Sequence, residues 1–181
     1  LALLDFAYDS DAGRAQAANI ARAMAQGCLS GSIVLARDRG ARAQCDADWN
    51  AQAQRRGYRS ELIEAATRHG LRQGQLTAIR SQPRLALFAN GVADALDPLP
   101  CAAGTHPVTD AAGADVAAQL RLRAAIQPWL DERIACPLSI CNEPKASDLA
   151  TWNTLALQLD LAPLTWRSRN PAATIQRSAD S

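Results

Sequence analysis

Residues 10–27 read Ser-Asp-Ala-Gly-Arg-Ala-Gln-Ala-Ala-Asn-Ile-Ala-Arg-Ala-Met-Ala-Gln-Gly, and this stretch indicates the fold class of the chain. Ser10 and Asp11 can cap a helix, because a short side-chain oxygen accepts hydrogen bonds from the free N–H groups of the first turn. Gly27 is a typical stop signal. We therefore predict a helix over residues 11–25, with a stripe of small and apolar residues at helical spacing: Ala15, Ala18, Ile20, Ala21 and Met24.

Alanine supplies 39 of the 181 residues, and alanine is both the best helix former and small enough to let helix axes approach closely. Glycine and proline divide the rest of the chain into further helical runs, which we place at residues 41–56, 60–68 with a weaker continuation over 71–80, 84–96, 115–126 and 147–159. Pro128 either kinks the helix over residues 115–126 or starts a new one over residues 129–135. Residues 32–36 are expected to be a connecting segment or a short helix. The sequence thus predicts an all-α fold, an irregular bundle of about six or seven short helices that can include a minor short strand pair.

The length of the chain is typical of one domain with a core of its own. We expect a single helical domain over residues 1–166 and a flexible polar tail over residues 167–181, whose composition is rich in Ala and Ser. The sequence has no run of 18 apolar residues, so no membrane span is predicted.

Five cysteines and the first residues bear on the cellular compartment. Cys136 and Cys141 enclose a short loop that can hairpin, and this pair is our first choice for a disulfide, with Cys28 and Cys45 as the second. The opening Leu1-Ala2-Leu3-Leu4 is compatible with the end of a removed signal peptide or anchor; the alternative is a helix end or a buried apolar strand of this domain. We expect a periplasmic or envelope-associated bacterial protein; the alternative is a cytoplasmic protein whose cysteines are all buried thiols.

The formal charge of +1 conceals an uneven distribution along the chain. Residues 37–84 contain ten arginines and five carboxylates, whereas residues 85–166 contain four basic residues and nine carboxylates. Such asymmetry can orient a charged partner, although it can also consist of solvated helix faces. Within the basic half, Arg55, Arg56 and Arg59 form a candidate phosphate-binding cluster, since guanidinium groups bind phosphate through paired hydrogen bonds. The nearby aromatic residues are too few for extensive base stacking, so nucleic-acid binding ranks only third among our hypotheses.

One constellation could support catalysis. Cys101 and His106 lie in the same loop, so they could form a thiolate–imidazole pair in a small hydrolase or transferase. No sequence signature of a hydrolase, nucleotide-binding or haem protein accompanies them. The four-residue separations within Cys101/His106 and within Cys136/Cys141 also disfavour a zinc site. We therefore predict no cofactor and no metal, and we interpret the pair Asp131/Glu132 as surface charge.

Interaction with another protein is the function we favour from the sequence. Trp166 and Arg167 follow the last helical run, and Trp and Arg are the residue types that most often anchor protein interfaces. The leading hypothesis is a non-enzymatic interaction module, such as an immunity protein, an inhibitor or a component of a secretion apparatus. The alternatives are the Cys101/His106 enzyme and the arginine-rich nucleic-acid-binding module.

Overall fold

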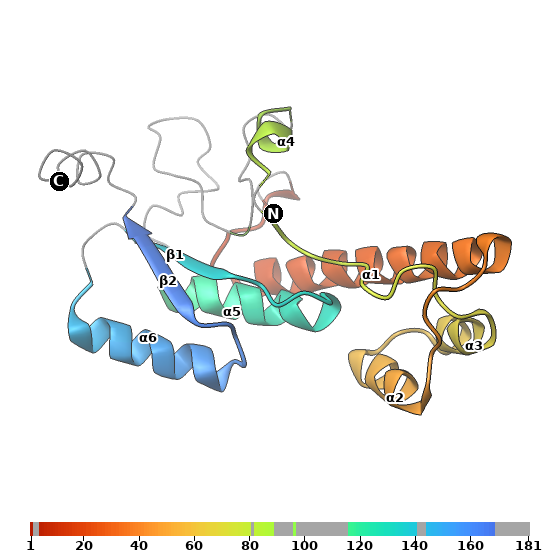
Figure 1. Ribbon diagram of the computed structural model, residues 1–181. Helices are drawn as coiled ribbons and strands as arrows, with labels where there is room; N and C mark the ends of the chain where they lie inside the picture. Colours follow the sequence, from red (N-terminus) through yellow and green to blue (C-terminus); the bar gives the residue numbers. More distant parts are fainter. Residues whose placement is uncertain (2–3, 81, 89–95, 97–115, 141–143, 169–181) are drawn as a thin grey trace, which may run out of the picture. The chain divides into compact units, whose positions relative to one another are not determined.

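The computed structural model describes residues 1, 4–80, 82–88, 96, 116–140 and 144–168 (Figure 1). The chain divides into two compact units. Unit 1 contains residues 1–17, 79–127 and 133–181, and unit 2 contains residues 18–78 and 128–132. The region that we predicted to be one helical domain therefore contains two packing units, each with a hydrophobic core of its own.

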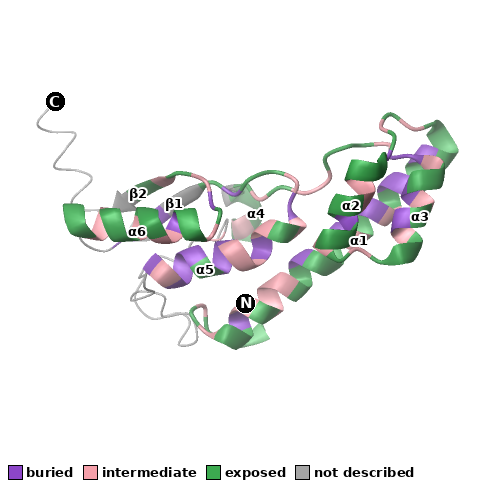
Figure 2. Cartoon of the chain, turned by 90° about the horizontal axis from the view of Figure 1, so that it is seen from below, coloured by how far each residue is buried: buried purple, intermediate pink, exposed green. Residues whose placement is uncertain are grey.

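Helix α1 spans Asp11–Arg39 and has 29 residues, so it is much longer than the helix predicted for residues 11–25. The prediction that Gly27 ends this helix is wrong, and residues 32–36 form its last turns. A glycine inside a helix costs only about 1 kcal/mol relative to alanine. Core packing outweighs that cost, because buried side chains recur beyond the glycine at helical spacing (Figure 2): Ala21, Ala25, Leu29, Ile33 and Ala36.

Helix α2 spans Ala47–Arg56 and begins later than the predicted start at residue 41. The carboxylate of Asp46 caps it, because Asp46 Oδ1 accepts a hydrogen bond of 2.8 Å from the backbone N–H of Trp49. Gly57 ends the helix in the left-handed conformation, with a φ of 76°. The predicted end of α2 is therefore confirmed, and the residues before Asp46 form an extended segment.

Helix α3 spans Ser60–His69, which confirms the helix predicted for residues 60–68. Arg59 occupies the N-cap position, and its side chain makes no capping hydrogen bond. Ile63 and Ala66 face the interior of unit 2 and are buried. The hydrophobic core of unit 2 joins α3 to α1 and to the extended segments on either side of the helix pair: Leu29, Ile33, Cys45, Ala66 and Leu71.

The helix predicted for residues 71–80 is wrong. Leu71 pairs with Ala43 in an antiparallel bridge, with the Leu71 N–H donating to the Ala43 carbonyl at 2.8 Å and the Ala43 N–H donating to the Leu71 carbonyl at 3.0 Å. The buried Ser32 hydroxyl holds the next residues, since Ser32 Oγ accepts hydrogen bonds of 3.1 Å from the N–H groups of Arg72 and Gln73. Contacts with distant parts of the chain thus replace the local hydrogen bonds of a helix.

Gly70 makes this change of direction possible, and replacing it should destabilise unit 2. Its φ is 70°, and a Cβ atom at this position would lie 2.6 Å from Ala41 Cβ and 2.8 Å from the Ala43 carbonyl oxygen. We expect Gly70→Ala to lower the free energy of unfolding by at least about 2 kcal/mol, measured by urea denaturation. Gly31→Ala is the matched control, because a Cβ there meets nothing within 4 Å. Gly31→Ala should raise stability by up to about 1 kcal/mol. Equal effects of the two substitutions would contradict this account.

Unit 1 contains a β–α–β arrangement that follows helix α5 (Val116–Ile126). Strands β1 (Cys136–Ile140) and β2 (Leu164–Ser168) are parallel, and helix α6 (Ala146–Gln158) connects them. Parallel strands need such a crossover connection. Helices α5 and α6 both lie against one face of the strand pair (Figure 1). A two-stranded sheet is marginal alone, so these helices stabilise it.

The core of unit 1 forms between this face and the two helices. Leu120 of α5 and Leu138 of β1 are completely buried, and Ile140 lies on the same face of β1 as Leu138 because strand side chains alternate. The remaining members of the core are Val116, Ala156 and Leu161, with Trp152, Leu155, Leu159 and Leu164 partly buried against them. The helices predicted for residues 115–126 and 147–159 are thus confirmed within one or two residues.

Two other predictions for unit 1 and its neighbouring segments need correction. The helix predicted for residues 129–135 is replaced by the short 3₁₀ turn η4 (Gln127–Trp129), because Pro128 cannot donate a helical hydrogen bond, and the chain then becomes extended. The loop predicted between Cys136 and Cys141 is strand β1 over residues 136–140. Helix α4 is described over Pro83–Phe88, and residues 89–95 of the predicted 84–96 helix lie outside the described residues.

The fold class predicted from the sequence is confirmed: the described chain is an irregular helical bundle with one minor strand pair. Strand β2 extends to Ser168, two residues into the predicted tail, and the rest of that tail lies outside the described residues. No helix within the described ranges is both long and apolar enough to span a membrane.

Candidate functional site

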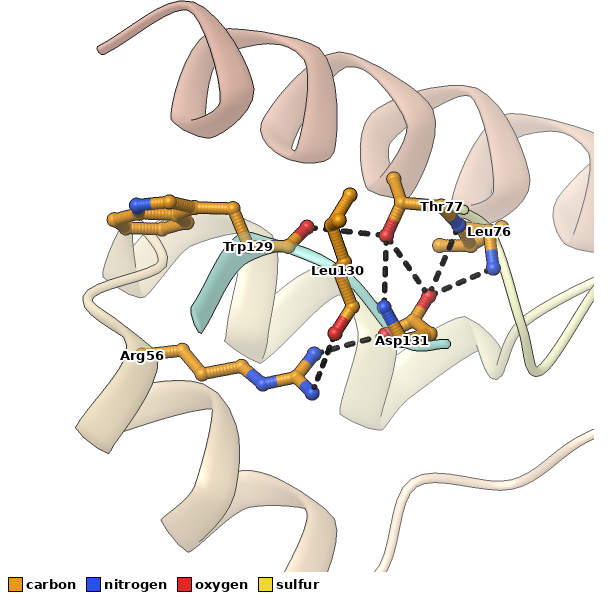
Figure 3. Close-up of polar contacts among 6 residues, drawn as sticks. All are labelled: Arg56, Leu76, Thr77, Trp129, Leu130 and Asp131. Carbon is orange, nitrogen blue, oxygen red and sulfur yellow. Dashed lines mark hydrogen bonds and ion pairs between the residues drawn. The ribbon is translucent and has the colours of Figure 1, made fainter. Parts of the chain in front are cut away.

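A polar cluster centred on Asp131 joins three segments of unit 2 (Figure 3). Asp131 Oδ1 accepts a hydrogen bond of 2.8 Å from Arg56 Nη1, which forms an ion pair between side chains that are 19% and 23% exposed. Asp131 Oδ2 accepts hydrogen bonds from the backbone N–H groups of Leu76, at 2.7 Å, and Thr77, at 3.2 Å. The carboxylate therefore joins α2 to the extended segment that follows α3.

Thr77 and Arg56 complete the Asp131 cluster through backbone groups of residues 129–131. Thr77 Oγ1 donates to the Trp129 carbonyl at 3.1 Å and accepts from the Asp131 N–H at the same distance. Arg56 Nη2 donates to the Leu130 carbonyl at 3.3 Å. Every one of these contacts joins residues 128–132 to residues of unit 2 that lie more than 50 positions earlier in the chain. The cluster therefore holds residues 128–132 against the rest of unit 2.

Beside this cluster is a cavity of about 20 Å³, lined by apolar side chains and by Arg56, Tyr58 and Asp131. A cavity of this size holds about one water molecule, whereas pockets for small ligands are usually at least about 300 Å³. Tyr58 packs edge-on against Trp129, with ring centroids 6.1 Å apart. Burial raises the pKa of the Tyr58 hydroxyl, and the negative charge of Asp131 raises it further, against an opposite influence of Arg56. The cluster is thus built for packing and does not form a substrate pocket.

The arginines that we proposed for phosphate binding have separate environments. Arg56 is engaged by Asp131, as described above. Arg55 is exposed and its Nε donates to the Ala51 carbonyl at 3.2 Å, while Arg59 is exposed at the start of α3. Sequence reasoning missed Asp131 because its partners are remote in sequence; the only local signal was the position of the carboxylate just after Pro128 and Trp129.

Cys28 and Cys45 are free thiols in the structure. Cys28 is exposed on α1 and Cys45 is buried in the core of unit 2, so the bridge predicted between them is absent. Burial raises the pKa of the Cys45 thiol, and the charge of neighbouring Asp46 raises it further. Both effects favour the neutral thiol, which packs as a small apolar side chain. Cys136 begins β1, while Cys141 lies outside the described residues, so their bridge stays a prediction.

Two other proposed sites fall partly or wholly outside the described residues. Cys101 and His106, the candidate catalytic pair, both lie outside them. Trp166 is 36% exposed in β2, opposite Leu138 in the register of the strand pair, and Arg167 is the next residue of that strand. Within the parts of the chain that the structure describes, no group of three or more His, Cys, Asp or Glu side chains could hold a metal ion.

Helix α1 also has an exposed, uncharged face that sequence reasoning did not identify. We call it the α1 outer face, and it lies opposite the buried stripe of the helix and comprises Ile20, Met24, Gly27, Gly31, Val34 and Leu35. Its four large side chains are between 37% and 64% exposed, and both glycines are exposed. The sequence signal for this face is the run of 14 uncharged residues from 23 to 36. A helix that is buried on one side normally carries charged residues on its other side, and this run has none.

Comparison of the chain with protein-family models and with curated proteins finds no match.

Proposed function

We propose that this chain is a non-enzymatic interaction module that binds protein through the α1 outer face. The observation that carries the proposal is the exposure of large apolar side chains on a helix whose other side is already packed in a core. Met24 is 64% exposed and Val34 is 44% exposed. The exposed face of a helix that packs on one side is normally polar or charged, whereas this face is uncharged over residues 23–36. Grouped apolar exposure of this kind is typical of protein contact sites.

Site-specific photo-crosslinking in cells tests this function. A photoreactive benzophenone side chain at position 24 should crosslink the chain to protein, whereas the same group at position 19, which is exposed on another side of α1, should crosslink weakly. The substitution Val34→Glu should abolish the product at position 24, because it places a charge in the apolar contact. Equal yields at positions 19 and 24, or a product that survives Val34→Glu, would contradict the proposal.

The proposed location is the periplasm or cell envelope, and its support is the cysteine content of the sequence. If the location is right, alkylation of the native protein without reductant, followed by peptide mass mapping, should find about two thiols lost to a disulfide. Cys28 and Cys45 should be alkylated as thiols, the latter only after unfolding, since they are free in the structure. Recovery of all five cysteines as thiols would contradict the exported location and would leave the contact function standing.

A further inference from the structure

The residues of the α1 outer face follow the spacing of a coiled-coil seam. Ile20, Met24, Gly27, Gly31 and Val34 are separated by four, three, four and three residues. This alternation is the heptad pattern of a and d positions, which brings one edge of a helix against a second helix along its length. The positions beside the seam are also uncharged: Ala23, Cys28, Ser30 and Leu35. The face is therefore shaped to receive a helix.

The two central glycines are unexplained by packing within the described chain. A Cβ atom at Gly27 or at Gly31 would meet nothing within 4 Å. Neither residue has a positive φ, because both lie inside the continuous helix α1. Each glycine costs the helix about 1 kcal/mol relative to alanine. Two glycines at i and i+4 leave a shallow notch at the middle of the seam, which lets another helix approach closely.

We infer that the α1 outer face binds the same face of a second copy of this chain, with the two helices antiparallel. A two-fold axis between the notches places Gly27 of one copy opposite Gly31 of the other, and Met24 opposite Val34. Between Met24 and Val34, small residues thus face small residues and large residues face large ones, while Ile20 lies opposite Asp38 at the end of the contact. No charged residue lies between positions 23 and 36, so the two copies bring no like charges together there. The inference rests on the proposed contact function and names its partner.

The area available is sufficient for a weak dimer. The seam from Ile20 to Leu35 is about 22 Å long at 1.5 Å per residue. Half the circumference of a helix about 10–12 Å across, taken over this length, is about 350–420 Å². Two copies together bury about 700–840 Å², which is below the roughly 1,000 Å² of a stable interface and typical of a weak, transient one. We therefore expect dissociation in the micromolar range.

Sedimentation velocity of the purified full-length chain tests the inference. The weight-average mass should rise from that of one chain to that of two as the concentration increases from about 1 µM to about 500 µM, which brackets micromolar dissociation. Met24→Glu should shift the midpoint at least about tenfold upward, because it places a charge in the seam. Asn19→Glu, the matched control on another side of α1, should leave the midpoint within about twofold.

The glycine variants provide the sharper test, because their two effects have opposite signs. Gly27→Ala/Gly31→Ala should raise the melting temperature of the dilute monomer, since the new methyl groups have free space and favour the helix. The same variant should weaken self-association at least about tenfold by filling the notch. A variant that is more stable and dimerises as well as the parent would overturn the glycine-mediated geometry.

The test also separates this inference from the function on which it rests. A chain that stays monomeric at every concentration overturns the second copy as partner. If position 24 still crosslinks in cells, in a product whose mass differs from two chains, the contact function survives with a different protein as its partner. If the chain is monomeric and position 24 does not crosslink, both are wrong.

Discussion

Asp131→Ala should lower the free energy of unfolding by about 3 kcal/mol, as measured by urea denaturation followed by circular dichroism. The substitution leaves the partly buried Arg56 without its carboxylate, and it leaves the N–H groups of Leu76 and Thr77 without their acceptor. Asp131→Asn keeps an acceptor oxygen and removes only the charge, so we expect roughly half of that loss.

An exposed ion pair supplies the control for Asp131. Arg133 Nη2 and Asp160 Oδ1 lie 2.7 Å apart, but the two side chains are 61% and 92% exposed. Asp160→Ala should therefore change stability by less than about 0.5 kcal/mol. In a double-mutant cycle, Arg56→Ala and Asp131→Ala should show a coupling of about 1–3 kcal/mol. Additive effects at these two positions would mean that the ion pair does not organise unit 2.

Leu138→Ala should lower the free energy of unfolding by about 2–5 kcal/mol. Leu138 is completely buried between the strand pair and the two helices, so truncation leaves a cavity that a short strand cannot readily close. Thermal or urea unfolding measures this loss. It corresponds to a large fraction of the total stability expected for a chain of this size.

Leu157→Ala is the matched control for Leu138, because it removes the same atoms from a side chain that is 79% exposed on α6. We expect a change within about 0.5 kcal/mol, and a slight gain is reasonable because alanine favours the helix. Similar losses at positions 138 and 157 would show that the β–α–β region of unit 1 is not packed as described.

Local signals predicted the helices whose ends are chemically marked. Gly57 ends α2, and Gly70 follows the last residue of α3, as the sequence indicates. Prediction was wrong where burial outweighs a local signal. Gly27 is a typical helix end, but Leu29 and Ile33 continue the buried stripe of α1 beyond it. A helix tolerates the free-energy cost of one glycine when the turns that follow are packed in a core.

Contacts between distant residues set the limit of sequence reasoning for the site. From the sequence we assigned Arg56 to an exposed basic cluster and interpreted Asp131 as surface charge. In both cases one adjacent residue in the sequence is also charged, which is typical of a solvent-exposed position. Their ion pair joins positions 75 residues apart, which no local periodicity encodes. The α1 outer face is different, since its four-three spacing is visible in the sequence and was obscured only by the expectation that the helix ended at Gly27.

The membership of residues 128–132 in unit 2 has a consequence for synthesis of the chain. These residues lie between α5 and β1, both of which belong to unit 1, so the chain enters unit 2, leaves it and returns for five residues. A nascent chain that has emerged only as far as residue 80 has α1, α2 and α3 but lacks the carboxylate that binds Arg56 and Thr77. Unit 2 thus becomes complete only after α5 has been made, and no single cut in the chain separates the two units intact.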